Sequence, residues 1–430
     1  MFWITVPVTI LGYPEVNRTR EILYTAPMGP TPTLAKTSIQ ETKLSLHQSD
    51  ASVHLDAVRG LAALAVFLGH GRPMFLKSRI RDLVGVGQPD SVAASAASPG
   101  PKPAAPHETV GHEAVIIFFV LSGYFVGGSA LRAMRKGVFS WKTYLFQRFT
   151  RLWIVLLPAL LLGWALDAGG MRFLPGEHNI YSGPAGQEEV SPDLASRLTP
   201  TVFAGNLFFL QTVFFREFGT NASLWSLSYE FWYYIFFPFL ATIFIPGKGM
   251  VQRVISVVVL VTLFVIFGTE LSRYFIIWLF GVVVSMVPLT LPEGRRRLAT
   301  VAACAAMVLA MVGILRVHLS LYLSDLILST VFFVFLWTIL HSKRATVNAT
   351  YRWLAQGLSK MSYTLYAVHL PFLAVVSAIL MPEWHAWTLS LRSVTMLLGV
   401  YAVVFAASWL MYFTFERNTD SIRKKLSMFG

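Results

Sequence analysis

A histidine, an arginine and an aspartate within one apolar stretch have the types and the spacing for acid–base chemistry. The stretch HLDAVRGLAALAVFLGH (54–70) carries Asp56 and Arg59 near its start and His70 at its end. Arg59 and His70 are eleven residues apart, about 16 Å and about three turns of a helix, so both side chains point roughly the same way. Because imidazole exchanges protons near neutral pH, we expect His70 to act as a general base at one end of this face.

Both parts of this stretch also have a structural interpretation. Asp56 and Arg59 could form a local ion pair that reaches the membrane surface; alternatively, Arg59 faces the cytoplasm and holds an anionic ligand. His70 could be a hydrogen-bonding residue of the core rather than a catalyst. Its alignment with Arg59 favours a function, and the small residues between the two leave room for another helix or a thin ligand.

The stretch LWSLSYEFWYYIFFPFL (224–240) carries an acid among aromatic residues. Ser226 and Glu230 are four residues apart and share a helix face. We expect Glu230 to orient His70 or a substrate, the alternative being a structural hydrogen bond to a neighbouring helix. The aromatic residues Trp225, Trp232, Tyr233 and Tyr234 are expected to form a belt at the membrane surface.

A second histidine lies in SKMSYTLYAVHLPF (359–372). Ser362, Tyr366 and His369 share one face of the predicted helix, and Pro371 is expected to bend it. His369 is therefore a catalytic candidate, the alternative being a hydrogen-bonding residue of the core.

Two more stretches carry polar residues that a ligand could use. FFVLSGYFVGG (118–128) places Ser122 within an apolar run, where small residues favour either close helix packing or a ligand. YLFQRFTRLW (144–153) places Arg148 and Arg151 three residues apart, on one face. That geometry suits phosphate, although basic residues at a cytoplasmic helix end also follow from membrane topology alone.

The elements that must position these residues are membrane helices. The chain of 430 residues is 55% hydrophobic and 13% charged, with a mean hydropathy of +0.59, whereas soluble domains are about 45–50% apolar and about 25% charged. We predict an all-α polytopic membrane protein with about ten spanning helices. The predicted spans are 56–76, 112–131, 149–167, 223–245, 251–268, 271–289, 298–316, 321–341, 361–381 and 389–415.

The charge distribution predicts the topology. The net charge of +13 comes from Lys and Arg that lie mainly between the apolar runs, which is the positive-inside pattern rather than a nucleic-acid-binding surface. The segment 201–215, about 15 residues long, is short for a span. If it does not cross, the later basic clusters and both termini all lie in the cytoplasm. We therefore predict a re-entrant or interfacial helix at 201–215 and both ends of the chain inside.

Three regions make up the predicted organisation. Residues 1–50 are a flexible cytoplasmic tail, 51–417 the transmembrane domain and 418–430 a basic cytoplasmic tail. Cys304 is the single cysteine, which excludes an intrachain disulfide. No metal site is expected.

Six of these motifs, in this order, resemble those of the transmembrane acyltransferase family three. The resemblance covers about residues 54–417 and rests on LDAVRGLAALAVFLGH, FFVLSGYFVGG, YLFQRFTRLW, LWSLSYEFWYYIFFP, SYTLYAVHLPF and the closing YFTFER. Proteins of this family transfer acyl groups, mostly acetyl, to extracytoplasmic sugars. The resemblance implies a cytoplasmic donor, acetyl-CoA or another short acyl-CoA, and a glycan or lipid-linked sugar as acceptor. It also implies the inner (plasma) membrane of a bacterium, where membrane lipid surrounds the protein.

The resemblance also implies roles for single residues. His70 matches the first-helix histidine that is the family's leading catalytic candidate, Glu230 the acid of the LWSL motif, and His369 the histidine of the SYxLYxxH motif. Residues expected to bind the donor are Arg59, Arg148 and Arg151, which match positions linked to activity, together with Ser122 and Tyr366.

From these roles we expect the pantetheine arm of the donor to pass beside the first helix to His70, which activates a sugar hydroxyl. Ser226, Ser122 or Tyr366 would donate to the tetrahedral oxyanion. An acyl-histidine intermediate is an alternative route.

Other functions are compatible with the same residues. A transporter or flippase also uses bilayer charges and bent helices, but it often contains internal repeats, and the sequence has no visible repeat. A further alternative keeps the acyltransferase and replaces the glycan by a lipid or small-molecule acceptor. The oligomeric state is open, with a homodimer included.

Overall fold

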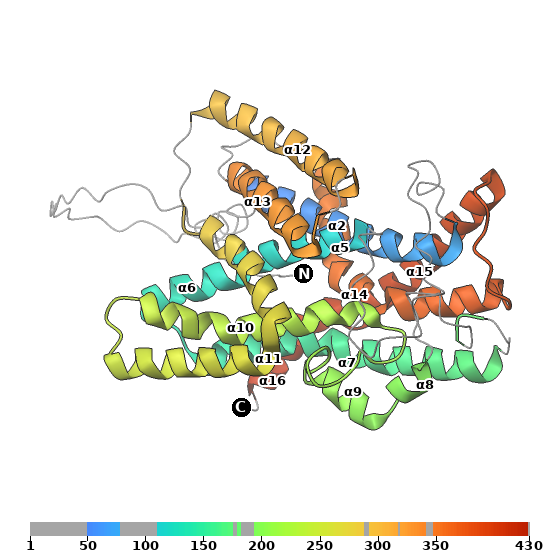
Figure 1. Ribbon diagram of the computed structural model, residues 1–430, viewed down its shortest axis with the longest axis horizontal. Helices are drawn as coiled ribbons and strands as arrows, with labels where there is room; N and C mark the ends of the chain where they lie inside the picture. The colour runs from blue at the N-terminus through green and yellow to red at the C-terminus, as the bar shows by residue number, and fades with distance from the viewer. Residues whose placement is uncertain are drawn as a thin grey trace, which may run out of the picture.

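The computed structural model describes residues 50–77, 110–174, 179–181, 193–287, 292–316, 319–340 and 347–428. Within these ranges the chain is helical, and its β-structure consists of two isolated bridges. The all-α class expected from the sequence is confirmed for this part of the chain (Figure 1). The predicted tail 1–50 lies, apart from its last residue, outside the described residues.

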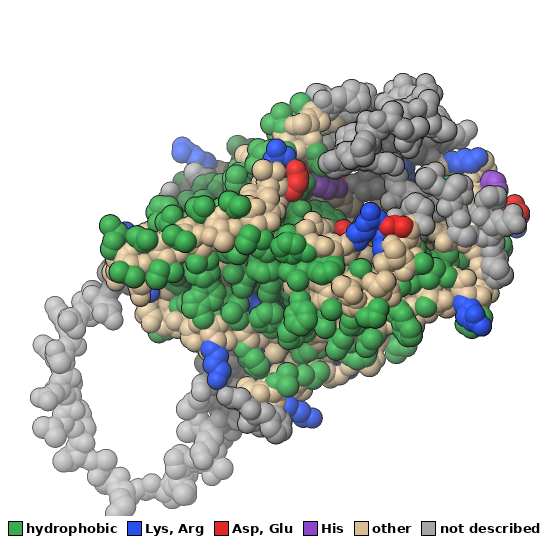
Figure 2. Space-filling model, turned by 60° about the horizontal axis from the view of Figure 1, so that its bottom comes forward, with side chains coloured by type: hydrophobic (Ala, Val, Ile, Leu, Met, Phe, Trp, Pro, Cys, Tyr) green, Lys and Arg blue, Asp and Glu red, His purple; other side chains and the backbone are tan. Residues whose placement is uncertain are grey.

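Eight helical segments are long and apolar enough to cross a membrane, which takes about 20 residues. They comprise α2 (Asp50–Phe75), the continuous run of α5 (Val110–Ser122), η1 (Gly123–Gly127) and α6 (Gly128–Arg135), α7 (Trp141–Phe173), α11 (Met250–Val284), α12 (Glu293–Arg316), α13 (Leu321–Leu340), α14 (Ala349–Leu380), and α15 (Leu391–Thr414) with its continuation. Only 11% of the apolar window of α12 is buried inside the protein. Figure 2 shows one face of the protein, on which hydrophobic side chains cover a large area and Lys and Arg lie mainly toward the edges.

α10 (Trp225–Phe244) and α11 account for the remaining predicted spans. α10 has 20 residues but is not among the eight apolar segments; its Tyr, Ser and Glu side chains lower its hydropathy. α11 is broken at Gly268, whose φ of 75° and ψ of −174° are non-helical and suit a residue without a Cβ. The ribbon of α11 turns sharply there (Figure 1), and the break falls at the end of the predicted span 251–268.

The segment after α7 is not a spanning helix. It begins with α8 (Leu194–Arg197) and α9 (Pro200–Leu207); α9, with eight residues, is about 12 Å long, whereas the hydrocarbon core is about 30 Å thick. An irregular path with two bulky or branched residues at positive φ, Phe209 and Thr212, leads to η2 (Ala222–Leu224) and α10.

α14 is the centre of the bundle and packs on α2, α7 and α15. Gly60 lets α2 approach α14 closely, since a Cβ at this position would lie 2.6 Å from Leu358 Cβ and 3.1 Å from the backbone nitrogen of Ser359. The two helices therefore run side by side, so that residues on facing turns can meet.

Several helices extend beyond the predicted spans, because a search for apolar segments does not detect the polar turns at helix ends. α7 starts eight residues before the predicted 149, where the Ser140 side chain caps its first turn, and α14 starts at Ala349, where Asn348 caps it. Beyond α15, η3 (Glu416–Asn418) leads to α16 (Thr419–Met428). The predicted basic tail is thus a helix, and it packs against α7.

Candidate active site

Two histidines meet between α2 and α14. His70 Nδ1 lies 3.1 Å from His369 Nε2, and the two rings are tilted by 30°. His369 is fully buried, whereas His70 is partly exposed. The structure thus brings together two residues that the sequence analysis selected independently.

The contacts of His369 assign the protons of this pair. Its Nδ1 lies 2.8 Å from the carbonyl oxygen of Tyr366 and 3.1 Å from that of Leu365. A carbonyl only accepts, so in the neutral pair His369 Nδ1 carries a hydrogen and Nε2 accepts from His70 Nδ1. The Nε2 of His70 is then left with its lone pair, as a general base requires.

The N-terminal part of α2 holds the predicted ion pair. Arg59 Nη2 donates to Asp56 Oδ1 at 2.9 Å, and the hydroxyl of Ser359 on α14 bonds both Arg59 and Asp56 Oδ1, the latter at 2.7 Å. Arg59 is 7% exposed. The pair therefore forms locally, as one alternative stated. Arg59 is buried against α14, whereas the side chain of Asp56 is 22% exposed.

The polar contacts between α2 and α14 thus include those of Arg59 with Ser359 and of His70 with His369. Ser359 and His369 are ten residues apart, about 15 Å along a helix, which nearly matches the spacing of Arg59 and His70. The expectation that Arg59 and His70 point the same way is met, because both side chains face α14.

Arg148 and Arg151 have different surroundings in α7. Arg151 Nη2 donates to the fully buried Glu416 at 2.9 Å, and Glu416 Oε2 accepts from the backbone nitrogen of Thr364 at 3.0 Å. Arg148 is 8% exposed; its guanidinium lies 5.6 Å from the ring centre of Tyr144, and its Nε has no hydrogen-bond partner. A buried cation without a carboxylate is costly unless an anion joins it, so Arg148 is a candidate anion-binding residue.

Glu230 is hydrogen-bonded to Ser122 and Tyr234 rather than to His70. Ser122 Oγ donates to Glu230 Oε1 at 2.7 Å, the Tyr234 hydroxyl donates to the same oxygen, and Trp278 Nε1 donates to Ser122 Oγ at 3.1 Å. The expectation of an aromatic belt was wrong for Tyr233 and Tyr234, which are 0% and 2% exposed and belong to the core.

A π-helical turn and two glycines position Ser122. η1 follows Ser122 directly, and such turns occur often at functional sites. A Cβ on Gly123 would overlap the carbonyl oxygen of Trp278, and one on Gly281 would overlap that of Val120. The absence of both Cβ atoms lets the backbones touch, which brings the indole of Trp278 to Ser122.

Ser226 and Tyr366 form a polar contact between α10 and α14. The Tyr366 hydroxyl donates to the carbonyl of Ser223 at 2.6 Å, so Ser226 Oγ, also 2.6 Å away, donates to Tyr366. The hydrogens of the three predicted oxyanion donors, Ser122, Ser226 and Tyr366, are thus all engaged within the protein.

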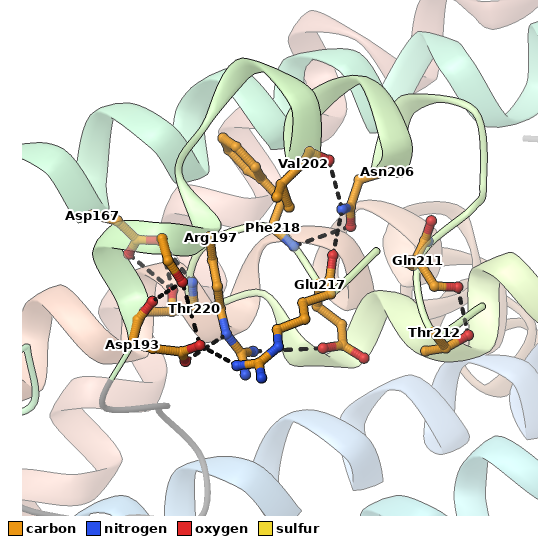
Figure 3. Close-up of polar contacts among 12 residues, drawn as sticks. Asp167, Asp193, Arg197, Val202, Asn206, Gln211, Thr212, Glu217, Phe218 and Thr220 are labelled. Carbon is orange, nitrogen blue, oxygen red and sulfur yellow. Dashed lines mark hydrogen bonds and ion pairs between the residues drawn. The ribbon is translucent and has the colours of Figure 1, made fainter. Parts of the chain in front are cut away.

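The segment 193–224 forms a hydrogen-bonded platform that holds the start of α10. Figure 3 shows Asp167 at the end of α7 facing Thr220, and Arg197 between Asp193 and Glu217. Asp167 accepts from the nitrogen and the hydroxyl of Thr220 at 2.8 and 2.9 Å. One residue further, the amide of Asn221 donates to the carbonyl of Ala367 on α14 at 2.6 Å.

The sequence analysis did not predict the polar contacts of four residues: Ser359, Tyr234, Trp278 and Glu416. Ser359, Tyr234 and Glu416 lie within quoted motifs, so the signal was present, but their partners are far away in sequence. Trp278 has no local signal, because it lies in an uninterrupted apolar run. The described residues contain no group of three or more metal-ligating side chains.

These features define a multi-pass helical membrane protein with paired histidines and buried arginines in its helix bundle. A family model described as an acyltransferase domain matches residues 53–413. The chain belongs to acyltransferase family 3, as the motifs indicated, and family membership indicates that it is a membrane acyltransferase. No curated protein and no solved structure matches the chain.

Proposed function

We propose that the protein moves an acetyl or other short acyl group from cytoplasmic acyl-CoA to a hydroxyl of an extracytoplasmic or lipid-linked glycan. The observation that carries this proposal is the histidine pair. Its hydrogen bonds leave a lone pair on His70 Nε2, at a partly exposed position within the bundle. A basic nitrogen held in one orientation suits the activation of a hydroxyl.

The donor is proposed to bind through the arginines at the other end of the α2–α14 contact. Acyl-CoA carries phosphates, and two or more guanidinium groups form the usual phosphate site. Arg148 supports this assignment best, because its buried guanidinium has no carboxylate partner in the described structure. Arg151 and Arg59 are proposed to add positive charge to the same site, although each already forms an ion pair, with Glu416 and Asp56 respectively.

In the proposed reaction, His70 Nε2 takes the proton of the acceptor hydroxyl while its oxygen attacks the thioester carbonyl. The tetrahedral oxyanion collapses, the C–S bond breaks, and the leaving CoA thiolate takes the proton from the imidazolium. The products are an O-acyl ester and CoA thiol, with no net proton released. Throughout, His369 accepts from His70 Nδ1 and so keeps the Nε2 aimed at the acceptor.

The proposed topology has about ten crossings, with both ends of the chain in the cytoplasm. It counts α10 and each arm of α11 as one crossing, in addition to the other seven apolar segments. The positive-inside rule supports it, since Arg132, Arg135 and Lys136 then lie inside, with the basic residues of α16. Replacing Cys304 by Ser and adding single cysteines at Lys136, Lys248 and Lys424 gives the test. Labelling of these sites by an impermeant maleimide in intact cells would refute this topology.

The reaction is tested with purified protein in proteoliposomes, by following release of CoA from acetyl-CoA in the presence and absence of acceptor. Acceptor-dependent release that disappears in His70→Ala is expected. Wild-type rates in His70→Ala would overturn the mechanism, and transport without thioester cleavage would favour a transporter. Glycan mass spectrometry of cells with and without the gene then identifies the acceptor, and unchanged glycans would point to a lipid or small-molecule acceptor.

A further inference from the structure

An apolar groove lies between α7 and α16, apart from the histidines. α7 contributes Trp153, Ile154 and Leu157, and Phe415, Ile422 and Leu426 form the opposite side, around a volume of about 270 Å³. Binding sites for drug-sized ligands usually measure about 300–1,000 Å³, so this groove suits a section of a hydrocarbon chain.

The groove is continuous with the surface that meets the bilayer. Leu157 is 40% exposed, and the next outward-facing residues of the same helix, Leu161 and Trp164, are exposed as well. An occupant can therefore enter sideways from the lipid, without passing through the protein.

α16 places positively charged side chains beside this groove. Ile422 and Leu426 form its apolar face, and Arg423 and Lys425 flank that face on either side. Arg423 is held by Asp420 and by Thr150 of α7, at 3.1 and 3.2 Å. Lys424 lies on the opposite side of α16, about 180° from the apolar face. The side chain of Lys425 is exposed and has no partner in the described structure. A short amphipathic helix with basic residues beside its apolar face is typical of binding to anionic lipid.

We propose that an anionic phospholipid binds here, with an acyl chain in the groove and its phosphate at Lys425. The charge of α16 selects the lipid, since a neutral lipid would fill the groove without using the lysine. A lipid of the same leaflet is also the occupant present at the highest local concentration.

The bound lipid would act on the donor site through Phe415. This residue lines the groove, and the next residue, Glu416, holds both Arg151 of α7 and Thr364 of α14. A lipid that holds Phe415 and α16 in place therefore holds Arg151 in place. This coupling rests on the proposed donor site, whereas lipid binding itself does not.

Native mass spectrometry of the purified protein tests the site, with phosphatidylglycerol and phosphatidylcholine as probes. We expect preferential retention of phosphatidylglycerol, weakened roughly fivefold at low salt in Lys425→Gln, the usual contribution of one lysine near an anionic lipid surface. The matched control is Lys424→Gln, which removes the same charge on the opposite side of α16 and should retain the lipid. Ile154→Trp fills the groove and should lose the lipid with Lys425 present.

Equal retention of the two lipids by the wild type would overturn the proposal, as would unchanged retention in the Lys425→Gln variant. Displacement of phosphatidylglycerol by acetyl-CoA would assign the groove to the donor instead. In nanodiscs, phosphatidylglycerol should lower the KM for acetyl-CoA in the wild type and leave it unchanged in Ile154→Trp. Lipid retention without a KM effect would remove the coupling to Arg151. Thermal unfolding of each variant identifies those that have lost the fold.

Discussion

His70 of α2 and His369 of α14 are 299 residues apart in sequence, and their ring nitrogens Nδ1 and Nε2 lie 3.1 Å apart. Because backbone carbonyls fix the proton of His369 on its Nδ1, the order of donors and acceptors runs in one direction, from His70 through His369 to the backbone of α14. His70 is thus the member of the pair whose outer nitrogen is available for a substrate, and His369 is the member that orients it.

Replacement of His70 by alanine should lower kcat for acceptor acylation about 10²- to 10⁴-fold, the usual contribution of a general base. The KM for acetyl-CoA should change little, because the arginines that are proposed to bind the donor lie about three turns away. CoA release in proteoliposomes measures both constants. His54→Ala is the matched control on the same helix, since His54 bonds Tyr351 at the far end of α2. Equal losses in the two variants would indicate a structural role for His70.

His369 is expected to behave as a positioning residue. In His369→Gln the amide can still accept from His70 Nδ1 and donate to a carbonyl of α14, so this variant should retain more kcat than His369→Leu. His369→Leu fills a comparable volume but leaves His70 without its acceptor. Measured with the same assay, a similar kcat for both variants, at similar thermal stability, would remove the orienting role.

Arg151 and Glu416 form a buried ion pair, so the loss of one partner should cost stability. Glu416→Leu leaves the Arg151 charge uncompensated and should destabilise the protein by about 3–5 kcal/mol. The double variant Arg151→Leu/Glu416→Leu should recover much of the thermal stability, yet keep a raised KM for acetyl-CoA. Thermal unfolding in detergent and steady-state kinetics separate these effects. A double variant with the wild-type KM would exclude Arg151 from the donor site.

Periodicity and hydropathy predicted where the helices lie and which residues share a helix face, because these two properties depend only on neighbours along one helix. The common face of Arg59 and His70, and the break between the arms of α11, were predictable in this way. The partner of each polar residue was not, since it lies on another helix. Tyr234 illustrates the limit: its aromatic neighbours suggested the membrane surface, whereas its buried hydroxyl bonds the carboxylate of Glu230 inside the bundle.

The extent of α7, α14 and α16 was also missed for a physical reason. Their polar end turns are stabilised by caps, by ion pairs and by the membrane surface, and a hydropathy window records these residues as loop. Arg148 and Arg151 lie around the predicted start of the α7 span, and the sequence located these cations without showing that both are buried.

Gly123→Ala should disrupt the hydrogen bonds that join Trp278, Ser122 and Glu230, although the backbone conformation of Gly123 permits alanine. The added Cβ would overlap the carbonyl oxygen of Trp278, so α11 must move away, and the indole of Trp278 would lose its contact with Ser122. We expect a cost of about 1–3 kcal/mol from overpacking. We also expect a lower kcat, because Ser122 then no longer fixes Glu230, whose remaining expected role is to orient the acceptor. Gly313→Ala is the control: nothing lies within 4 Å of a Cβ there, so this helix should become slightly more stable. Equal melting temperatures and equal activity for the two variants would show that the close contact of η1 with α11 does not hold the site.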